Sequence, residues 1–272
     1  MLKRIIHGRY GTMRLYSCIT LLLLSFLISC QKDPLINCDC NLPFKEMLCK
    51  KYLFDNNICI GYIDYDYNAQ LLKETENYKT VKGKVEKTIS FTYNSMGSVS
   101  CENIKTISPV KNVSFLYSYN AANKIEKIEQ RENESLVKSS LFLYNDSNVL
   151  QKTEIYNSGV LDSLILFEYD TAGKLWRQSV FGNDSALISY QIHQFFFNGI
   201  ERINFFNSND VYLGYNLFVH NNDGNMFSFA TYGSANDLLE KTIYEYENKL
   251  LIKETTADGF GKTIRYLVYF YS

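Results

Sequence analysis

The chain has 272 residues, with 28 lysines and arginines against 29 aspartates and glutamates and a formal net charge of −1. This balance excludes the strongly basic surface by which proteins bind nucleic acid. The length allows one substantial hydrophobic core or two small ones. The composition of 22 tyrosines and 18 phenylalanines, with only 3 prolines, favours β-strands.

An apolar run over residues 21–28 is preceded by basic residues and followed by Ser29 and Cys30. The run is shorter than the roughly 20 residues that span a bilayer, and it fits the apolar part of a secretory signal. Leu27-Ile28-Ser29-Cys30 resembles the bacterial lipobox, in which a branched apolar residue and a small residue precede the cysteine. The resemblance implies a lipoprotein signal peptide at 1–29 and acylation of Cys30. The alternative is an ordinary signal peptide with a chance cysteine.

Gln31-Lys32-Asp33 follows the cysteine and is similar to the surface-export signals of Bacteroidetes lipoproteins. The similarity implies a protein anchored in the outer membrane by its lipid, on the periplasmic or the cell-surface face. The membrane is then a partner of the chain through its N-terminus.

Residues 30–60 form a cysteine-rich segment. In an oxidising envelope its four cysteines predict two disulfides, in which the first two each pair with one of the last two: Cys38, Cys40, Cys49 and Cys59. Free thiols are one alternative and a zinc site is another, although the segment has no C-x-x-C pair and no nearby histidine. Cys101 stands apart, without a predicted partner.

Residues 61–272 carry an internal repeat of about 25 residues. Each copy places two aromatic residues one position apart, as in Phe167-Glu168-Tyr169, and a polar turn follows. The second member of the pair recurs at intervals of 23–28 residues, at Tyr67, Tyr93, Tyr119, Tyr144, Tyr169, Phe197, His220, Tyr246 and Tyr271.

The turns are rich in Asn, Asp and Gly, which close β-hairpins. One repeat is therefore one hairpin, and successive hairpins predict an all-β antiparallel meander of about sixteen strands after Cys59. Residues two apart share a face, so Phe167 and Tyr169 project together and Leu164 and Leu166 project the other way. We expect the aromatic residues of successive hairpins, as at Tyr93, Tyr119, Tyr144 and Tyr169, to line one face and to stack as a ladder across the hairpins. We expect the sheet to curl into a barrel or spiral, because a flat sheet of that width would expose its edges. A β-propeller with two hairpins per blade is the alternative.

The segment Tyr169-Asp170-Thr171-Ala172-Gly173-Lys174-Leu175 resembles the YD repeat of RHS-type proteins, and Tyr144-Asn145 and Tyr119-Asn120 keep its start. The resemblance implies hairpins wound into a hollow β shell, as in YD-repeat Bacteroidetes lipoproteins of unassigned role.

No catalytic, cofactor or metal motif stands out, and we expect neither enzyme activity nor a cofactor. His220 replaces an aromatic residue of the repeat, so we expect a structural role, and His193 is the other histidine after residue 29. Asp64-Tyr65-Asp66 has no calcium loop after it. Four glutamates on predicted strands are expected to pair with basic residues: Glu154, Glu168, Glu245 and Glu254.

Charges on both faces of the return strands, as at Glu201 beside Arg202, disfavour a transmembrane barrel. The sequence therefore predicts a lipid-anchored envelope protein with a non-catalytic binding or scaffolding role. Exposed aromatic residues such as Trp176 could contact a glycan or a protein ligand, or belong to the core. The alternative function is a glycan-active envelope enzyme with two carboxylates in a cleft.

Overall fold

The computed structural model describes residues 47–271, which contain eighteen β-strands and no helix. The first nine are β1 (Leu48–Asp55), β2 (Ile58–Tyr67), β3 (Lys73–Thr80), β4 (Val85–Tyr93), β5 (Val99–Ile107), β6 (Val110–Tyr119), β7 (Ile125–Glu132), β8 (Ser135–Tyr144) and β9 (Leu150–Asn157). The other nine are β10 (Val160–Tyr169), β11 (Leu175–Gly182), β12 (Leu187–Phe196), β13 (Ile200–Asn207), β14 (Tyr212–His220), β15 (Met226–Gly233), β16 (Leu238–Glu247), β17 (Leu250–Asp258) and β18 (Thr263–Tyr271).

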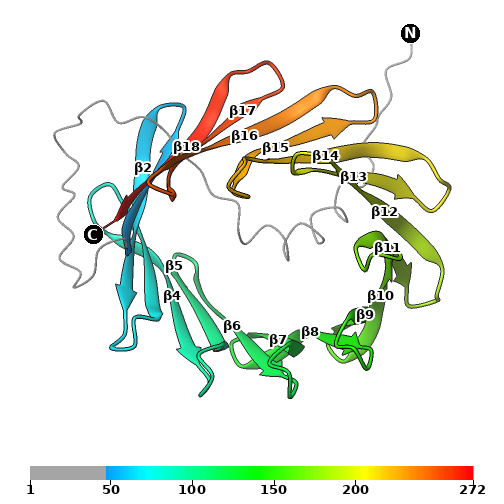
Figure 1. Ribbon diagram of the computed structural model, residues 1–272. Helices are drawn as coiled ribbons and strands as arrows, with labels where there is room; N and C mark the ends of the chain where they lie inside the picture. The colour runs from blue at the N-terminus through cyan, green and yellow to red at the C-terminus, as the bar shows by residue number, and fades with distance from the viewer. Residues whose placement is uncertain (1–46, 272) are drawn as a thin grey trace, which may run out of the picture.

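Every strand pairs antiparallel with the next along the chain, and the ring closes where β1 pairs with β18, from Leu48 opposite Tyr271 to Asp55 opposite Arg265 (Figure 1). The prediction of an antiparallel meander of hairpins closing into a barrel is confirmed. The sheet is a single closed ring, neither an open spiral nor a set of propeller blades. The sixteen strands β3–β18 follow Cys59 as predicted. β1 and the start of β2, which lie in the cysteine-rich segment 30–60, complete the ring.

The barrel has two rims, and turns closed by an Asn or Asp side chain occur at both. The tyrosine rim is the one at which β1 begins, β18 ends and each even-numbered strand turns into the next odd-numbered one. In its commonest turn an Asn or Asp side chain accepts two backbone N–H bonds, as Asp170 does from Ala172 and Lys174 at 2.9 and 2.8 Å. Gly173 then takes a φ of 77°, which glycine adopts without strain. The same arrangement begins at Asn68, Asn94, Asn120, Asn145 and Asn221.

The opposite rim holds the turns from odd-numbered to even-numbered strands. Its first turn, Asn56-Asn57, has φ values of 44° and 67°. Positive φ at both central positions is the mark of a type I′ hairpin turn, whose twist matches that of the strands.

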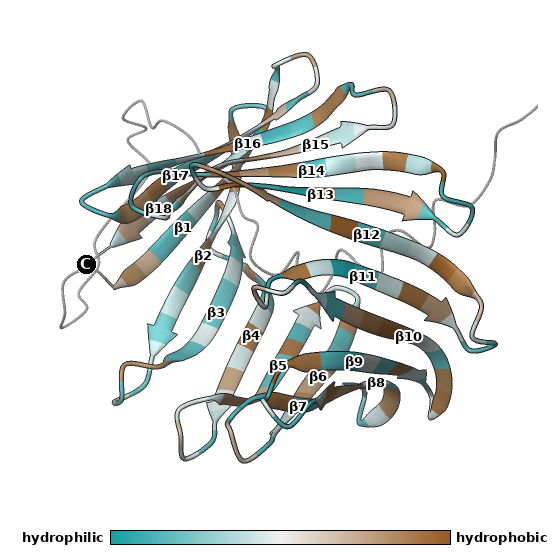
Figure 2. Ribbon diagram, turned by 45° about the vertical axis from the view of Figure 1, so that its right-hand side comes forward, coloured by the Kyte–Doolittle hydropathy of each residue, from teal (hydrophilic) through white to brown (hydrophobic). Residues whose placement is uncertain are grey.

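Side chains alternate between an inner and an outer face, and hydropathy alternates with them along many strands (Figure 2). In the first five repeats the residue between the two aromatic residues is exposed, and the aromatic residues are buried or half-buried, as at Thr92 between Phe91 and Tyr93. The convex side of a curved sheet is the more exposed one, so the aromatic pairs face inward. Leu164 and Leu166 lie on the opposite face from Phe167 and Tyr169, as predicted, and this is the outer face.

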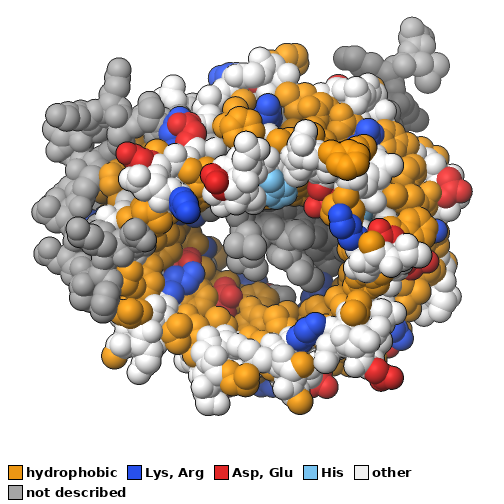
Figure 3. Space-filling view, viewed as in Figure 1, with side chains coloured by type: hydrophobic (Ala, Val, Ile, Leu, Met, Phe, Trp, Pro, Cys, Tyr) orange, Lys and Arg blue, Asp and Glu red, His pale blue; other side chains and the backbone are white. Residues whose placement is uncertain are grey.

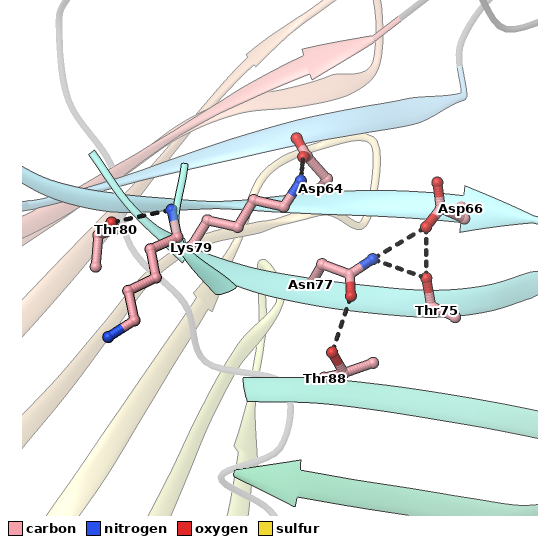
Figure 4. A network of polar contacts seen from close by, with 8 residues as sticks. Asp64, Asp66, Thr75, Asn77, Lys79, Thr80 and Thr88 are labelled. Carbon is pink, nitrogen blue, oxygen red and sulfur yellow. Dashed lines mark hydrogen bonds and ion pairs between the residues drawn. The ribbon is translucent and has the colours of Figure 1, made fainter. Parts of the chain in front are cut away.

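The outer face of β2–β4 is polar (Figure 4). The Asp66 carboxylate accepts hydrogen bonds from Thr75 and Asn77 at 2.6 and 3.0 Å, and Thr88 donates to the Asn77 side chain at 2.9 Å. Such a surface belongs in water or among polar groups, because lipid offers these side chains no partners.

The best-buried apolar side chains gather in two places within the wall. One cluster lies at the β1–β18 seam around Tyr52, Phe54 and Tyr266, and the other joins Ile155, Ile165 and Val180 on β9–β11. None of the described segments forms a helix of the length and hydropathy that crosses a membrane.

Candidate functional site

The space enclosed by the ring is the candidate site. Barrels of sixteen to eighteen strands are wide enough to leave an open channel between their inner side chains. The space-filling view shows the centre of the molecule hollowed, with hydrophobic side chains on its wall and charged side chains among them (Figure 3). The strand registers place eight phenylalanines on the inner face: Phe91, Phe115, Phe142, Phe167, Phe195, Phe205, Phe218 and Phe229.

The repeated aromatic position has a structural role at the tyrosine rim. Seven tyrosines donate a hydrogen bond from the side-chain hydroxyl to a backbone carbonyl at the start of the preceding strand, at 2.5–3.0 Å: Tyr67, Tyr93, Tyr119, Tyr144, Tyr169, Tyr246 and Tyr271. The prediction that Tyr93, Tyr119, Tyr144 and Tyr169 share one face of the sheet is confirmed. The expected stacking between their rings is wrong, because an intervening strand separates neighbouring tyrosines by about 10 Å.

The two remaining repeats lack this tyrosine. His220 replaces it with a ring nitrogen, and its Nδ1 lies 2.9 Å from the carbonyl oxygen of Gly199. In β12 the register places Phe195, and not Phe197, at the equivalent position, and its ring has no polar atom to donate.

A buried group of ionisable residues lies on the inner face of β17, β18 and β1, which are neighbours in the ring. Lys51 is 9 % exposed and Glu254 is 2 % exposed. The Tyr269 hydroxyl donates to Glu254, and the Lys51 amino group lies 5.0 Å from the centre of the Tyr269 ring. Burial lowers the pKa of Lys51 to about 8, although Glu254 and Glu76 favour its charged form. A lysine in this state has a substantial neutral fraction near pH 8.

A second group continues from Glu76 along the inner face of β3–β6. The Tyr78 hydroxyl donates to Glu76 at 3.0 Å, and the Tyr117 hydroxyl donates to Glu102 at 3.3 Å. Burial raises the pKa of Glu102 and lowers that of Lys87, whose amino group lies 3.5 Å from the centre of the Tyr78 ring. These residues give the lumen hydrogen-bond donors and acceptors beside its aromatic rings.

His193 lies on the inner face of β12 with its Nδ1 3.0 Å from a carboxylate oxygen of Glu201 and its Nε2 3.2 Å from the side-chain nitrogen of Gln191. A carboxylate on one ring nitrogen fixes the orientation of an imidazole. The pair therefore adds a fixed polar patch to the wall on the side of the barrel formed by β12 and β13.

The four glutamates singled out from the sequence divide between the two faces. Glu154 and Glu245 lie on the outer face and pair with Lys152 and Lys253, and the Glu168 carboxylate lies 3.6 Å from Arg177. Glu254 faces inward. The described residues contain no group of three or more side chains able to hold a metal ion, Asp64 and Asp66 included.

Cys30, Cys38 and Cys40 lie outside the described residues, so acylation and the disulfide pairing stay predictions. Cys49 is buried with its sulfur 3.4 Å from the carbonyl oxygen of Phe270, and the Cys59 sulfur lies 3.7 Å from the carbonyl oxygen of Gly61.

The sequence analysis did not single out Lys51, Glu76 or Glu102. A signal existed for the two glutamates, because each lies opposite an inward-facing aromatic residue of the neighbouring strand. Glu76 lies opposite Tyr65 and Glu102 opposite Phe91. A charged residue in phase with an aromatic face marks a polar group on an otherwise apolar wall.

No protein-family model matches the chain, and no curated protein matches it either. Among solved structures, a porin-like protein from Bacteroides uniformis is 11% identical with a TM-score of 0.48, covering 83% of this chain and 96% of that one. A porin-like protein from Bacteroides vulgatus is 8% identical with a TM-score of 0.37, covering 83% and 98%. A protein of unknown function from Bacteroides fragilis is 10% identical with a TM-score of 0.18, covering 63% and 92%. At TM-scores below 0.5 these similarities assign no activity to this chain.

Proposed function

We propose that this chain is a lipid-anchored protein of the outer membrane whose barrel lumen binds a glycan without turning it over. The observation that carries the proposal is the inner wall, where phenylalanine rings alternate with buried polar side chains. Binding sites of this kind combine aromatic contact area with a few placed polar groups. The lipobox resemblance at Cys30 supports the anchor, and the YD-repeat resemblance supports a hollow shell.

A glycan fits this wall better than an apolar or a strongly charged ligand. Sugar rings present C–H surfaces to aromatic faces and hydroxyl groups to polar side chains. Lys51 and Lys87 supply donors, while Glu76 and Glu102 supply acceptors, so the wall carries both kinds of group without a strong net charge. The width of an eighteen-stranded ring suits a chain of several sugars more than one small molecule.

One observation favours a second candidate, a glycan-active enzyme. Glu102 has a raised pKa because it is buried, and the charge of Glu76 contributes to that shift. A carboxyl group with a raised pKa near a second carboxyl group is an arrangement that glycosidases use for acid–base chemistry. Substitution of Glu102 by Gln would then abolish hydrolysis and leave binding intact.

The first experiment is a glycan array with the purified full chain, followed by a hydrolysis assay on every glycan that binds. Phe167→Ala removes an inner-face ring, and Leu166→Ala removes its outer-face neighbour on the same strand as a matched control. We expect Phe167→Ala to weaken binding about tenfold, corresponding to about 1.4 kcal/mol, and Leu166→Ala to leave binding unchanged. Equal losses in both variants would contradict a lumenal site, and product release would favour the enzyme.

The anchor is tested separately by metabolic labelling with a palmitate analogue. We expect the label on the wild-type chain and its loss in Cys30→Ala. Labelling that survives the substitution would remove Cys30 as the acylation site.

A further inference from the structure

Five exposed aromatic side chains gather at three successive turns of the tyrosine rim. Trp176 is 39% exposed, Phe195 44%, Phe196 52%, Phe197 94% and Phe227 50%. We call these five residues the aromatic patch. Within the described part of the chain they are all but one of the tryptophans and phenylalanines exposed to this degree; the other is Phe260 on the opposite rim. The strands that carry the patch, β11–β15, pair consecutively, so it spans about 19 Å of the rim (Figures 1 and 2).

The patch coincides with the break in the repeat. In β12 the register places Phe195 where other repeats have a tyrosine bonded to backbone. The five-residue turn built on an Asn or Asp side chain is replaced there by the shorter turn Phe197-Asn198-Gly199, whose last two residues have φ values of 65° and 70°. Trp176 and Phe227 occupy the unpaired positions of register shifts in β11 and β15. Such bulges re-aim side chains. The same register shift recurs in other hairpins of this rim, where the unpaired position holds Glu74, Ser100, Glu126, Gln151 or Ile252. Aromatic residues at this position in β11 and β15, together with the shortened turn between them, therefore bring large apolar rings to the same stretch of surface. Soluble surfaces seldom expose a patch of this kind without a partner.

We infer that the aromatic patch inserts into the interface of a phospholipid bilayer and fixes the tyrosine rim against the membrane. The choice of a lipid partner rests on the proposed anchor. β1 begins at this rim, and the 17 residues from Gln31 to Met47 reach at most about 60 Å when fully extended. The acylated end of the chain therefore leads to the rim that carries the patch.

The chemistry of the patch fits that partner. Tryptophan and phenylalanine favour the boundary between headgroups and acyl chains. The exposed Lys174 has its amino group 4.9 Å from the centre of the Phe195 ring, which places a cation beside the rings at the level of lipid phosphates. The polar outer face of β2–β4 stays out of the hydrocarbon, because only the tips of the hairpins enter it.

Trp176 is the only tryptophan of the chain, so it reports on the patch without any substitution. The full chain is reconstituted with phosphatidylcholine vesicles, with and without brominated acyl chains, and its fluorescence is compared. We expect brominated lipid to lower Trp176 emission about twofold, as for a side chain within about 10 Å of the headgroup boundary. Phe197→Trp in a Trp176→Phe background should be quenched at least as strongly.

Phe260→Trp in the same background is the matched control, because Phe260 is 98% exposed on the opposite rim. We expect no quenching there. Equal quenching at both rims, or quenching at position 260 alone, overturns the inference. A blue shift of Trp176 emission that grows with protein concentration, without quenching by brominated lipid, assigns the patch to contact with a second copy of the chain. This result also overturns the inference.

The quenching experiment and the palmitate-labelling experiment give independent results. An unlabelled chain with quenched Trp176 refutes the anchor and keeps the insertion, whereas a labelled chain with unquenched Trp176 refutes the insertion alone.

Discussion

The tyrosine hydroxyls of the rim should each contribute measurably to the stability of the barrel. Tyr144 donates to the carbonyl oxygen of Ile125 at 2.8 Å, and both groups are half-buried. Tyr144→Phe keeps the ring and removes only this bond. A neutral hydrogen bond of this kind contributes about 1 kcal/mol net, and the carbonyl left behind loses a partner. For a domain of this size the loss corresponds to a Tm lower by about 2–4 °C.

Tyr232→Phe is the control. Its ring stacks on Tyr215 with centres 4.4 Å apart, so the substitution preserves the contact. We expect a change below about 0.5 kcal/mol. Chemical denaturation of both variants, with equal m-values, checks the difference.

The seven rim tyrosines give the same reasoning a second test. The bonds lie in separate hairpins, so their losses should add, and two distant Tyr→Phe substitutions should cost about 2 kcal/mol together. If Tyr144→Phe is no less stable than Tyr232→Phe, the hydroxyl hydrogen bond does not stabilise the barrel, and the tyrosine at this position of the repeat contributes through its ring alone.

Three further outcomes are expected. Folding lowers the pKa of Lys51 from 10.5 to about 8, so the buried positive charge destabilises the folded protein below pH 8, and this cost is relieved as the pH rises to 10.5. Between pH 8 and 10.5 the free energy of unfolding of the wild type should therefore rise by about 3 kcal/mol relative to that of Lys51→Met, as measured by denaturation at a series of pH values. Asp170→Ala should cost about 1 kcal/mol by removing the acceptor of two turn N–H groups, while Asp170→Asn should cost little, as thermal unfolding would show. Gly214→Ala would place a Cβ 2.2 Å from the Tyr232 carbonyl oxygen at a φ of 131°, so it should cost at least about 3 kcal/mol, against about 1 kcal/mol for the open Gly224→Ala site.

The period of the aromatic pairs predicted the hairpins, their antiparallel order and the shared face of the rim tyrosines, because strand alternation and turn chemistry are local properties. The first strand, β1, which forms the seam with β18, was harder to predict from the sequence. β1 carries Tyr52 and Phe54 on its outer face, out of phase with the inward aromatic pairs, so the repeat did not extend to it. The turn signal Asn56-Asn57 was present and would have placed a hairpin there.

The site was less predictable than the fold. Alternation says that two faces differ but not which of them is concave, and the inner position of Lys51 and Glu254 depends on closure between the first and last strands. The outer pairs of Glu154 and Glu245 were predictable because their partners lie on the same or the adjacent strand. The ligand is set by residues from many strands at once, and no short stretch of sequence records that arrangement.

The ring has seventeen pairings between consecutive strands and one between its ends. Its circumference is therefore proportional to the number of hairpins, and each added hairpin lengthens the circumference by about 10 Å without disturbing the pairing of the others. Duplication or loss of one 25-residue unit would change the bore of the barrel in a single genetic event. The width of such a barrel can therefore change in steps of one hairpin, whereas enlarging a packed core would need many coordinated substitutions.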